Sequence, residues 1–439
     1  MPENDLDGGE DRSQAKAEGL GRGGTDGFFP VSRMLWITCL VQFVLLLALA
    51  FALWHAPKPD SDRPIAPSSP ASVSSDVYFK GNPGPWGQLE YARIQLKPSD
   101  EFIPTDAHCF GPTRWFFEGY TRPALSHFFD QCGLTASQLA GLKDPAIWQD
   151  QPSGIEVMPP DDLVLGLAEP ARERIYSVLA RSRLNILHLW PFKSREGGVD
   201  EWFGQSGLSA GTLALLRQLT YSRGGRLCFS DLSIVYPRIS TSEERRRLIK
   251  TLASTSALLV KLQVKPDSDV AALADYWSKG QRTKDIQALL ESLKNIPGGM
   301  TIDVTHLLPP FARKRLYTFP VPPLNSAKVG WPDCNWTAMN FFNDPPDDRF
   351  YDSDVWMNEL HQNYTEVKQA TFGDLIVFFR PDGFPIHMVV FIADDIVFTK
   401  NGSSSWHPWT LMKWDDLMAD YTLDYVPAYI VFHPKEQTE

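Results

Sequence analysis

Short apolar runs separated by turn-forming residues mark the last part of the chain. Residues 375–380 and 387–392 are two such runs, and Pro381-Asp382-Gly383 lies between them. Asp394-Asp395 then precedes a third run at 396–399. Apolar runs of this length bounded by turns are typical of buried strands. The pattern predicts a three-stranded antiparallel meander.

A predicted helix precedes this meander. Residues 334–342 carry Trp336, Met339 and Phe341 at helical offsets, and Asp333 is well suited to cap the helix. Cys334 would then stand at the first helical position, where free backbone N–H groups favour the thiolate. The alternative is that Cys334 is a small buried hydrophobic residue.

The predicted meander contains a candidate general base for this thiol. His387 opens the second strand, and alternation along the third strand places Thr399 and Asn401 on one face. A hairpin brings these residues beside His387, so either Thr399 or Asn401 can accept the second N–H of the imidazole. The predicted catalytic set is therefore Cys334, His387 and Asn401, with Thr399 as the alternative third member.

This order of motifs resembles the NlpC/P60 branch of the papain-like cysteine peptidases. The resemblance rests on Asp-Cys at a helix start, Gly-Asp-Leu-Ile-Val-Phe, and His-Met-Val-Val-Phe-Ile followed by a turn and a strand. It covers residues 326–439 and implies an α+β domain with a helix on an antiparallel sheet. It also implies Cys–His acyl transfer on peptide bonds, with no metal or organic cofactor. The family pattern Asp-Cys-Ser-Gly is replaced by Asp-Cys-Asn-Trp, and Thr399 stands where a third histidine is common.

The middle of the chain repeats itself. FFDQCGLTASQLAGL at 128–142 recurs as WFGQSGLSAGTLALL at 202–216, a shift of 74 positions, and more weakly at 276–290. Gly224-Gly225 likewise reappears as Gly298-Gly299. We expect tandem α/β repeats of about 74 residues that serve as a recognition or spacer domain.

A second repeated element is rich in arginine. ARERIYS at 171–177 returns as ARKRLYT at 312–318, with a looser copy ending at Ala253. Two arginines on one helical turn could line a groove that binds an acidic or glycan-like partner. They could also form an exposed basic helix face, which is the more common arrangement for runs of charged residues.

Residues 34–54 contain no charged side chain and are long enough to cross a bilayer as a helix. The stretch is longer than a signal-peptide core, and Trp36 and Trp54 stand near its ends. Together with the resemblance, this segment implies a single-pass bacterial inner-membrane protein whose carboxy-terminal domains are periplasmic or extracytoplasmic. The predicted parts are a disordered tail (1–33), the transmembrane helix (34–54), a Pro/Ser-rich linker (55–77), the repeat domain (78–325) and the catalytic domain (326–439).

The charge and cysteine content of the chain limit the classes of binding partner that it can have. The net charge is −11 at pH 7, which excludes a basic nucleic-acid-binding surface. Five cysteines without a CxxC pair argue against a zinc site, although Cys109 and Cys132 could form a disulfide in an oxidising compartment. The expected partners are the membrane and a cell-wall polymer or envelope protein.

Two functions fit these patterns. The first is a membrane-anchored thiol hydrolase, a peptidase or amidase of the cell envelope that acts on cell-wall peptides. The second is a non-catalytic envelope scaffold that retains a papain-like fold for binding alone.

Overall fold

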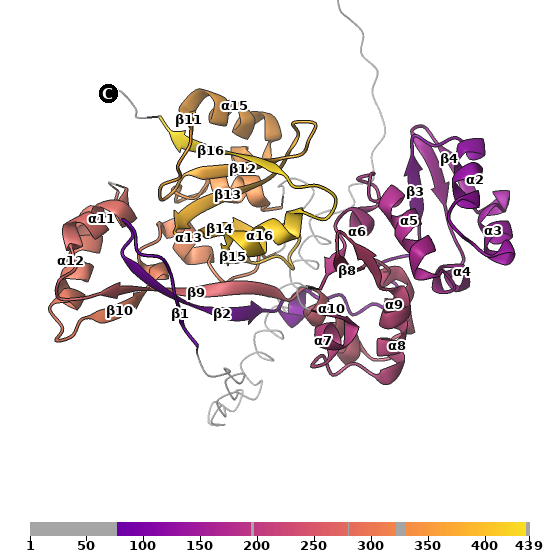
Figure 1. Cartoon of the computed structure of the whole chain (residues 1–439), viewed down its shortest axis with the longest axis horizontal. Helices are drawn as coiled ribbons and strands as arrows, with labels where there is room; N and C mark the ends of the chain where they lie inside the picture. Colours follow the sequence, from indigo (N-terminus) through magenta and orange to yellow (C-terminus); the bar gives the residue numbers. More distant parts are fainter. Residues whose placement is uncertain (1–76, 195–196, 280, 322–330, 436–439) are drawn as a thin grey trace, which may run out of the picture. The chain divides into compact units, whose positions relative to one another are not determined.

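The computed structural model describes residues 77–194, 197–279, 281–321 and 331–435, which fold as an α+β unit (Figure 1). Two modules of the same design come first. In the first module (residues 115–179), the strands pair in the order β3-β5-β4, and in the second module (residues 186–252) in the order β6-β8-β7. A pair of helices separates the first strand from the following hairpin in both modules. The same connectivity therefore occurs twice in succession.

The elements of the two modules have the following bounds. The first contains β3 (Trp115–Glu118), α2 (Arg122–Asp130), α3 (Ala136–Leu142), η2 (Pro145–Ile147), β4 (Trp148–Gln151), β5 (Gly154–Val157), α4 (Asp161–Leu165) and α5 (Glu169–Leu179). The second contains α6 (Ile186–Leu189), β6 (Phe192–Lys193), α7 (Val199–Phe203), α8 (Ala210–Leu219), β7 (Tyr221–Arg223), β8 (Arg226–Phe229), α9 (Leu232–Arg238) and α10 (Ser242–Leu252).

The residues that repeat in sequence occupy matching positions in these modules. Gly133 and Gly207 both adopt a positive φ, at 75° and 68°, in the turn between the paired helices. Glycine adopts this conformation without a steric penalty, which explains why both copies keep it. Thr135 and Ser209 then cap α3 and α8, each accepting the backbone N–H of the third helical residue.

The arginine-rich segment departs from the exposed basic face that charge patterning favoured at one position, since Arg174, Arg313 and Lys314 are exposed but Arg172 is not. Arg172 is fully buried. Its guanidinium lies 3.4 Å from the Asp231 carboxylate and donates to the carbonyls of Val164, Leu167 and Gln218. Burial of such a charge requires this set of partners, so the arginine ties α5 to the elements around it.

A third group of elements combines segments from before and after the two modules. Strands β1 (Phe79–Lys80), β2 (Gln88–Leu96), β9 (Thr255–Val264) and β10 (Met300–Asp303) form an antiparallel sheet in the order β1-β2-β9-β10. Helices α11 (Val270–Ser278), α12 (Thr283–Lys294) and α13 (Pro310–Arg315) and two short 3-10 helices, η1 (Asp100–Phe102) and η3 (Val304–His306), complete this part. We call residues 255–315 the third module.

The carboxy-terminal module (residues 331–434) contains a six-stranded antiparallel sheet in the order β11-β16-β12-β13-β14-β15. Its strands are β11 (Tyr364–Val367), β12 (Leu375–Phe379), β13 (Pro385–Ala393), β14 (Ile396–Lys400), β15 (Trp409–Lys413) and β16 (Ala428–Pro434). Its helices are α14 (Cys334–Met339), η4 (Asp348–Tyr351), α15 (Ser353–Asn363) and α16 (Trp414–Tyr421). The three strands of the predicted meander are therefore present as β12, β13 and β14.

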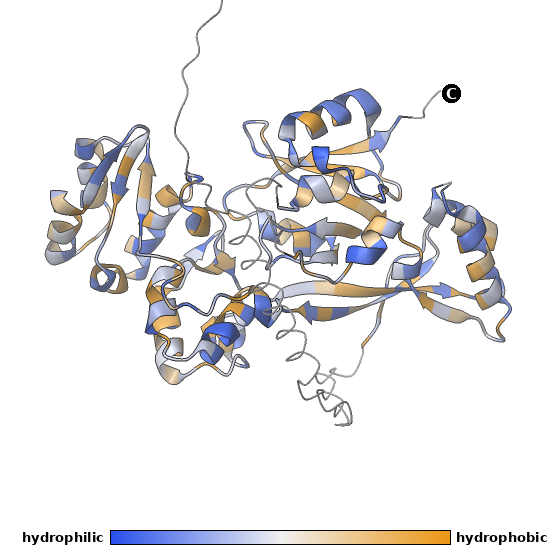
Figure 2. Ribbon diagram, turned by 180° about the vertical axis from the view of Figure 1, so that it is seen from behind, coloured by the Kyte–Doolittle hydropathy of each residue, from blue (hydrophilic) through white to orange (hydrophobic). Residues whose placement is uncertain are grey.

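This sheet is covered on both faces, which explains why its central strands are continuously apolar (Figure 2). Met388, Val390 and Phe398 belong to a core that also contains Trp336 and Phe341 of the α14 region. Val389 and Val397 belong to a separate core with Leu417 of α16. Alternation along β13 and β14 thus assigns each side chain to one helix or the other.

The third module and the carboxy-terminal module share the first of these cores. Trp277 and Phe311 pack in the same cluster as Trp336 and Phe398. The backbone adds a direct link, because Tyr317 donates to the carbonyl of Trp409 at 2.8 Å. A single core therefore extends across the domain boundary that we predicted at residues 325/326.

The membrane prediction requires correction. In residues 77–435, apart from the undescribed gaps, no helix is long and apolar enough to cross a bilayer. The longest is α12, with 12 residues, whereas a span needs about 20. The predicted transmembrane segment, 34–54, and the tail before it lie outside the described residues, as does the linker except for residue 77. This finding contradicts the single-pass fold, the membrane and envelope description and the inner-membrane localisation, and we do not retain them.

The docking of the second module on the carboxy-terminal module yields a first prediction. A Cβ added to Gly224 would lie 2.2 Å from the Leu423 carbonyl oxygen, whereas one added to Gly225 meets nothing within 4 Å. Both glycines have positive φ, so both substitutions carry a backbone cost of about 1 kcal/mol. We expect Gly224→Ala to lower the free energy of unfolding in urea clearly more than the matched control Gly225→Ala. Equal losses would contradict close packing at Leu423.

Candidate active site

Cys334 begins α14, and Asp333 caps this helix by accepting the N–H of Trp336 at 2.8 Å. The helix packs against β13 and β14. The sulfur lies 3.7 Å from the Asn335 side-chain oxygen and also accepts a hydrogen bond from the backbone N–H of Met388. Since Met388 directly follows His387, the thiol lies beside the backbone of β13 next to the predicted base.

The acidity of this thiol differs from the expectation. Burial raises the pKa of Cys334 to about 12, and the negative charge of Asp333 adds to the increase. The N–H of Met388 and the positive charge of Lys400 act in the opposite direction but do not offset it. A six-residue helix whose N-cap carries a carboxylate does not favour a thiolate at its first position, so Cys334 is a neutral thiol at pH 7.

His387 is buried, and its ring contacts two aromatic rings. Tyr421 stacks on it at 4.4 Å between centroids, and Phe378 is nearly parallel to it at 5.9 Å. Burial lowers the pKa of His387 to about 3, although the nearby Asp420 carboxylate favours the charged form. The imidazole is therefore neutral at physiological pH, which is the form that can accept a proton.

A directed series of hydrogen bonds fixes the orientation of this ring. Nε2 of His387 lies 3.0 Å from Oγ1 of Thr399, whose hydroxyl donates to Oδ1 of Asn401 at 2.8 Å. Nδ2 of Asn401 then donates to the carboxylate of Asp420 at 3.4 Å. Because each donor points toward the carboxylate, the network assigns the proton to Nε2 and leaves Nδ1 as an acceptor.

The predicted third residue is thus resolved into two. Thr399 contacts the imidazole directly, and Asn401 orients the Thr399 hydroxyl. Both belong to the same network as His387, on or directly after β14.

The sulfur and the ring, however, belong to different sides of β13. Met388 faces the core that contains α14, so alternation directs His387 to the other face, toward Phe378 and Tyr421. Among the described residues, no hydrogen bond joins the sulfur of Cys334 to the imidazole. The backbone of Met388 provides the connection between the two groups.

Two further titratable groups belong to this region, Lys400 near the thiol and His407 near Lys400. Lys400 is fully buried, donates to the carbonyls of Gly402 and Ser404, and has a pKa lowered to about 7 by burial. His407, expected on the surface, is half-buried with Nδ1 3.1 Å from Ser404 Oγ, and burial lowers its pKa to about 3. A lysine within an otherwise apolar strand was the signal that could have revealed Lys400.

Other candidate groups have structural roles. Asp374 is fully buried and accepts bonds from Lys279, His433 and the backbone of Thr371, so it joins the turn before β12 to α11 and β16. The four described cysteines are free, including Cys109 and Cys132, which sequence reasoning allowed to pair. In the part of the chain that the structure describes, no group of three or more His, Cys, Asp or Glu side chains is placed to hold a metal.

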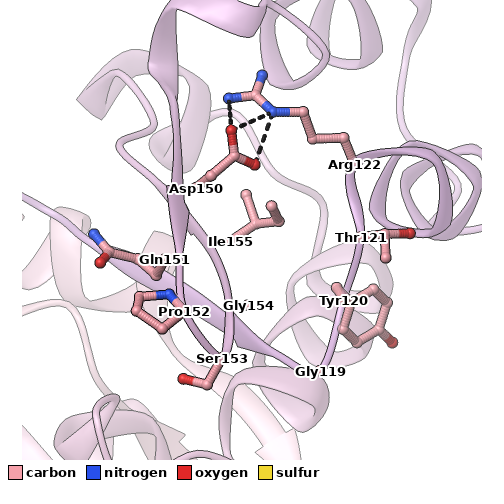
Figure 3. A pocket seen from close by; sticks show the side chains of 10 residues that line it. All are labelled: Gly119, Tyr120, Thr121, Arg122, Asp150, Gln151, Pro152, Ser153, Gly154 and Ile155. Carbon is pink, nitrogen blue, oxygen red and sulfur yellow. Dashed lines mark hydrogen bonds and ion pairs between the residues drawn. The ribbon is translucent and has the colours of Figure 1, made fainter.

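A shallow hollow of about 430 Å³ lies on the first module, away from these groups (Figure 3). Turn residues before α2 and the β4–β5 hairpin line it, and Arg122 and Asp150 form an ion pair at 2.8 Å beside it. The thiol and the imidazole do not line it, so it does not serve their chemistry.

Comparison with known proteins adds no relative: no family model, curated protein or solved structure matches the chain. The resemblance to NlpC/P60 peptidases therefore stays a prediction from the sequence.

The cap residue provides a test of the thiol's environment. Asp333→Asn keeps an N-cap side chain but removes the charge that raises the pKa of Cys334, so the thiolate fraction should increase. We expect Cys334 to react several-fold faster with iodoacetamide at pH 9 in this variant. The matched control is Asp347→Asn, which changes the equivalent cap of η4. An unchanged rate at Cys334 would contradict the electrostatic role of Asp333.

The neutral histidines predict acid sensitivity. His188 and His387 have pKa values lowered to about 3 by burial, against 6.5 when unfolded, so the unfolded chain binds more protons between these values. The free energy of unfolding should therefore fall as pH decreases from 6.5 toward 3, by up to about 1.4 kcal/mol per pH unit for each histidine. Urea unfolding across this range measures the slope. His188→Phe should reduce it, and an unchanged slope would show that His188 is not held neutral.

Proposed function

We propose that the carboxy-terminal module is a thiol-dependent acyl-transfer enzyme that hydrolyses an amide or ester bond. Cys334 is the nucleophile and His387 the general base. The observation that carries this proposal is the hydrogen-bond series through Thr399 and Asn401, which leaves Nδ1 of His387 as a proton acceptor. Such a series orients a base in many hydrolases.

The reaction starts from a neutral pair. As the Cys334 sulfur attacks the carbonyl carbon, Nδ1 of His387 takes the thiol proton, which avoids a free thiolate. The imidazolium then gives its proton to the leaving amine or alcohol, and a thioester forms at Cys334. Water, deprotonated by the same nitrogen, hydrolyses the thioester and restores the thiol.

Substrate binding completes the geometry in this proposal. The thiol contacts the N–H of Met388, whereas the imidazole of the preceding residue lies on the other side of β13, so the proposal requires the start of β13 to rearrange when substrate binds. Catalytic hydrogen bonds are commonly long in unliganded enzymes and shorten in the substrate complex.

The experiment uses p-nitrophenyl acetate as an acyl donor to the full chain. Release of p-nitrophenol and mass-spectrometric mapping of the acetylated cysteine are measured at pH 7. We expect acetylation of Cys334, with at least a tenfold slower rate in His387→Gln. Cys109→Ser, which removes an exposed thiol, serves as the control and should retain the wild-type rate.

A second function, a non-catalytic binding scaffold, is favoured by a specific observation. The ring of His387 and the α14 core lie on opposite sides of β13, and burial keeps the thiol neutral. In that case Cys334 would remain unmodified in the acetylation experiment, or would react equally in wild type and His387→Gln. Either result would replace the enzymatic proposal with the scaffold.

A further inference from the structure

Asp420 is the negatively charged end of the hydrogen-bond series that begins at His387. Its Oδ2 accepts from Asn401 at 3.4 Å, and its side chain is only 16% exposed. Asp420 is the next-to-last residue of α16, and Tyr421 after it stacks on the imidazole. The end of this helix therefore supplies both the charge and the aromatic ring that face His387.

The second module holds this end of α16 in place. Lys193 of β6 donates to the Asp420 carbonyl at 2.5 Å, and Arg226 of β8 donates to the Ala419 carbonyl at 2.7 Å. Cations at the carboxyl end of a helix satisfy its free carbonyls and complement its dipole. Both cations also lie 3.8 Å from the other carboxylate oxygen, Oδ1.

We propose that Asp420 is a positioning residue for His387 and that Lys193 and Arg226 of the second module control its effect on the imidazole. This inference rests on the proposed function, since it assigns the repeat modules a role in setting the base. Asp420 touches neither the sulfur nor the ring, and acts through Asn401 and Thr399.

The charges around Asp420 determine whether the pKa of His387 rises or falls. With two cations beside it, the carboxylate is largely compensated and does little to favour an imidazolium. Loss of these two cations leaves the anion less compensated in a shielded environment, which favours the protonated ring. Loss of the carboxylate as well removes this effect.

Of the other titratable groups nearby, Tyr421 of α16 stacks on the ring. Lys400 and Asp333 act on Cys334 at the other side of β13, and His407 lies near Lys400. None of them is changed in the comparison below, so their contribution is constant.

The test follows the imidazole directly, by NMR titration of the full chain labelled with ¹³C and ¹⁵N histidine, with the His387 signal assigned from His387→Gln. We expect the pKa of His387 to rise by about one unit in Lys193→Gln/Arg226→Gln. Adding Asp420→Asn should abolish this rise. The amide proton of Asn401 should also shift on titration of the ring in wild type but not in the Asp420→Asn protein.

The matched control is Asp424→Asn, which removes the ion pair with Arg223 at the same interface without touching Asp420. It should leave the pKa of His387 unchanged. A similar rise in this control, or no rise in the double variant, would show that the cations act only by joining the modules and would overturn the inference.

The titration needs no substrate, so its result is independent of the acetylation experiment. If the pKa shifts as expected while Cys334 is never acetylated, the positioning network exists but the hydrolase proposal fails. If Cys334 is acetylated and the pKa of His387 does not change, the hydrolase proposal is supported and Asp420 is not a positioning residue.

Discussion

Burial of the carboxy-terminal sheet on both faces is the constraint on which the site depends. Side chains alternate along a strand, so each residue of β13 and β14 belongs either to the side of α14 or to the side of α16. Met388 and Lys400 face the thiol side, whereas His387 and Thr399 face Tyr421 and Asn401. The backbone of β13 is therefore where the two halves of the candidate site meet.

The repeat modules stabilise these halves separately. The third module shares a core with α14, through Trp277 and Phe311, and so supports the side that carries the thiol. The second module binds the end of α16, through Lys193 and Arg226, and so supports the side that carries the imidazole. A role as spacer alone, one of the two roles that the sequence suggested for the repeats, does not account for contacts of this kind.

Sequence patterns predicted the local features of the site well, because those features depend on nearby residues. Asp333 as a cap, the strand that His387 opens and the neighbourhood of Thr399 all follow from short-range periodicity. The helix α16 and strands β11, β15 and β16 were not predicted. Nor could the pKa of the thiol be inferred, because it depends on burial by residues far away in the chain.

Arg172 shows the same limit. A charged residue in a repeated basic motif reads as exposed, yet its guanidinium is fully buried because carbonyls from two separate segments converge on it. Convergence of this kind has no local signature, since Val164, Leu167 and Gln218 are unremarkable in sequence.

The two similar hairpins show how a repeated structure can acquire different roles. Gln151 pairs with Gly154 at the tip of the β4–β5 hairpin, and Arg223 pairs with Arg226 at the tip of the β7–β8 hairpin. The second tip meets the carboxy-terminal module, with Arg223 on Asp424 and Arg226 on the end of α16. The first tip lines the hollow in Figure 3. The two arginines that stand in place of a glutamine and a glycine thus give the second tip the charges that bind Asp424 and, together with Lys193 of β6, the end of α16.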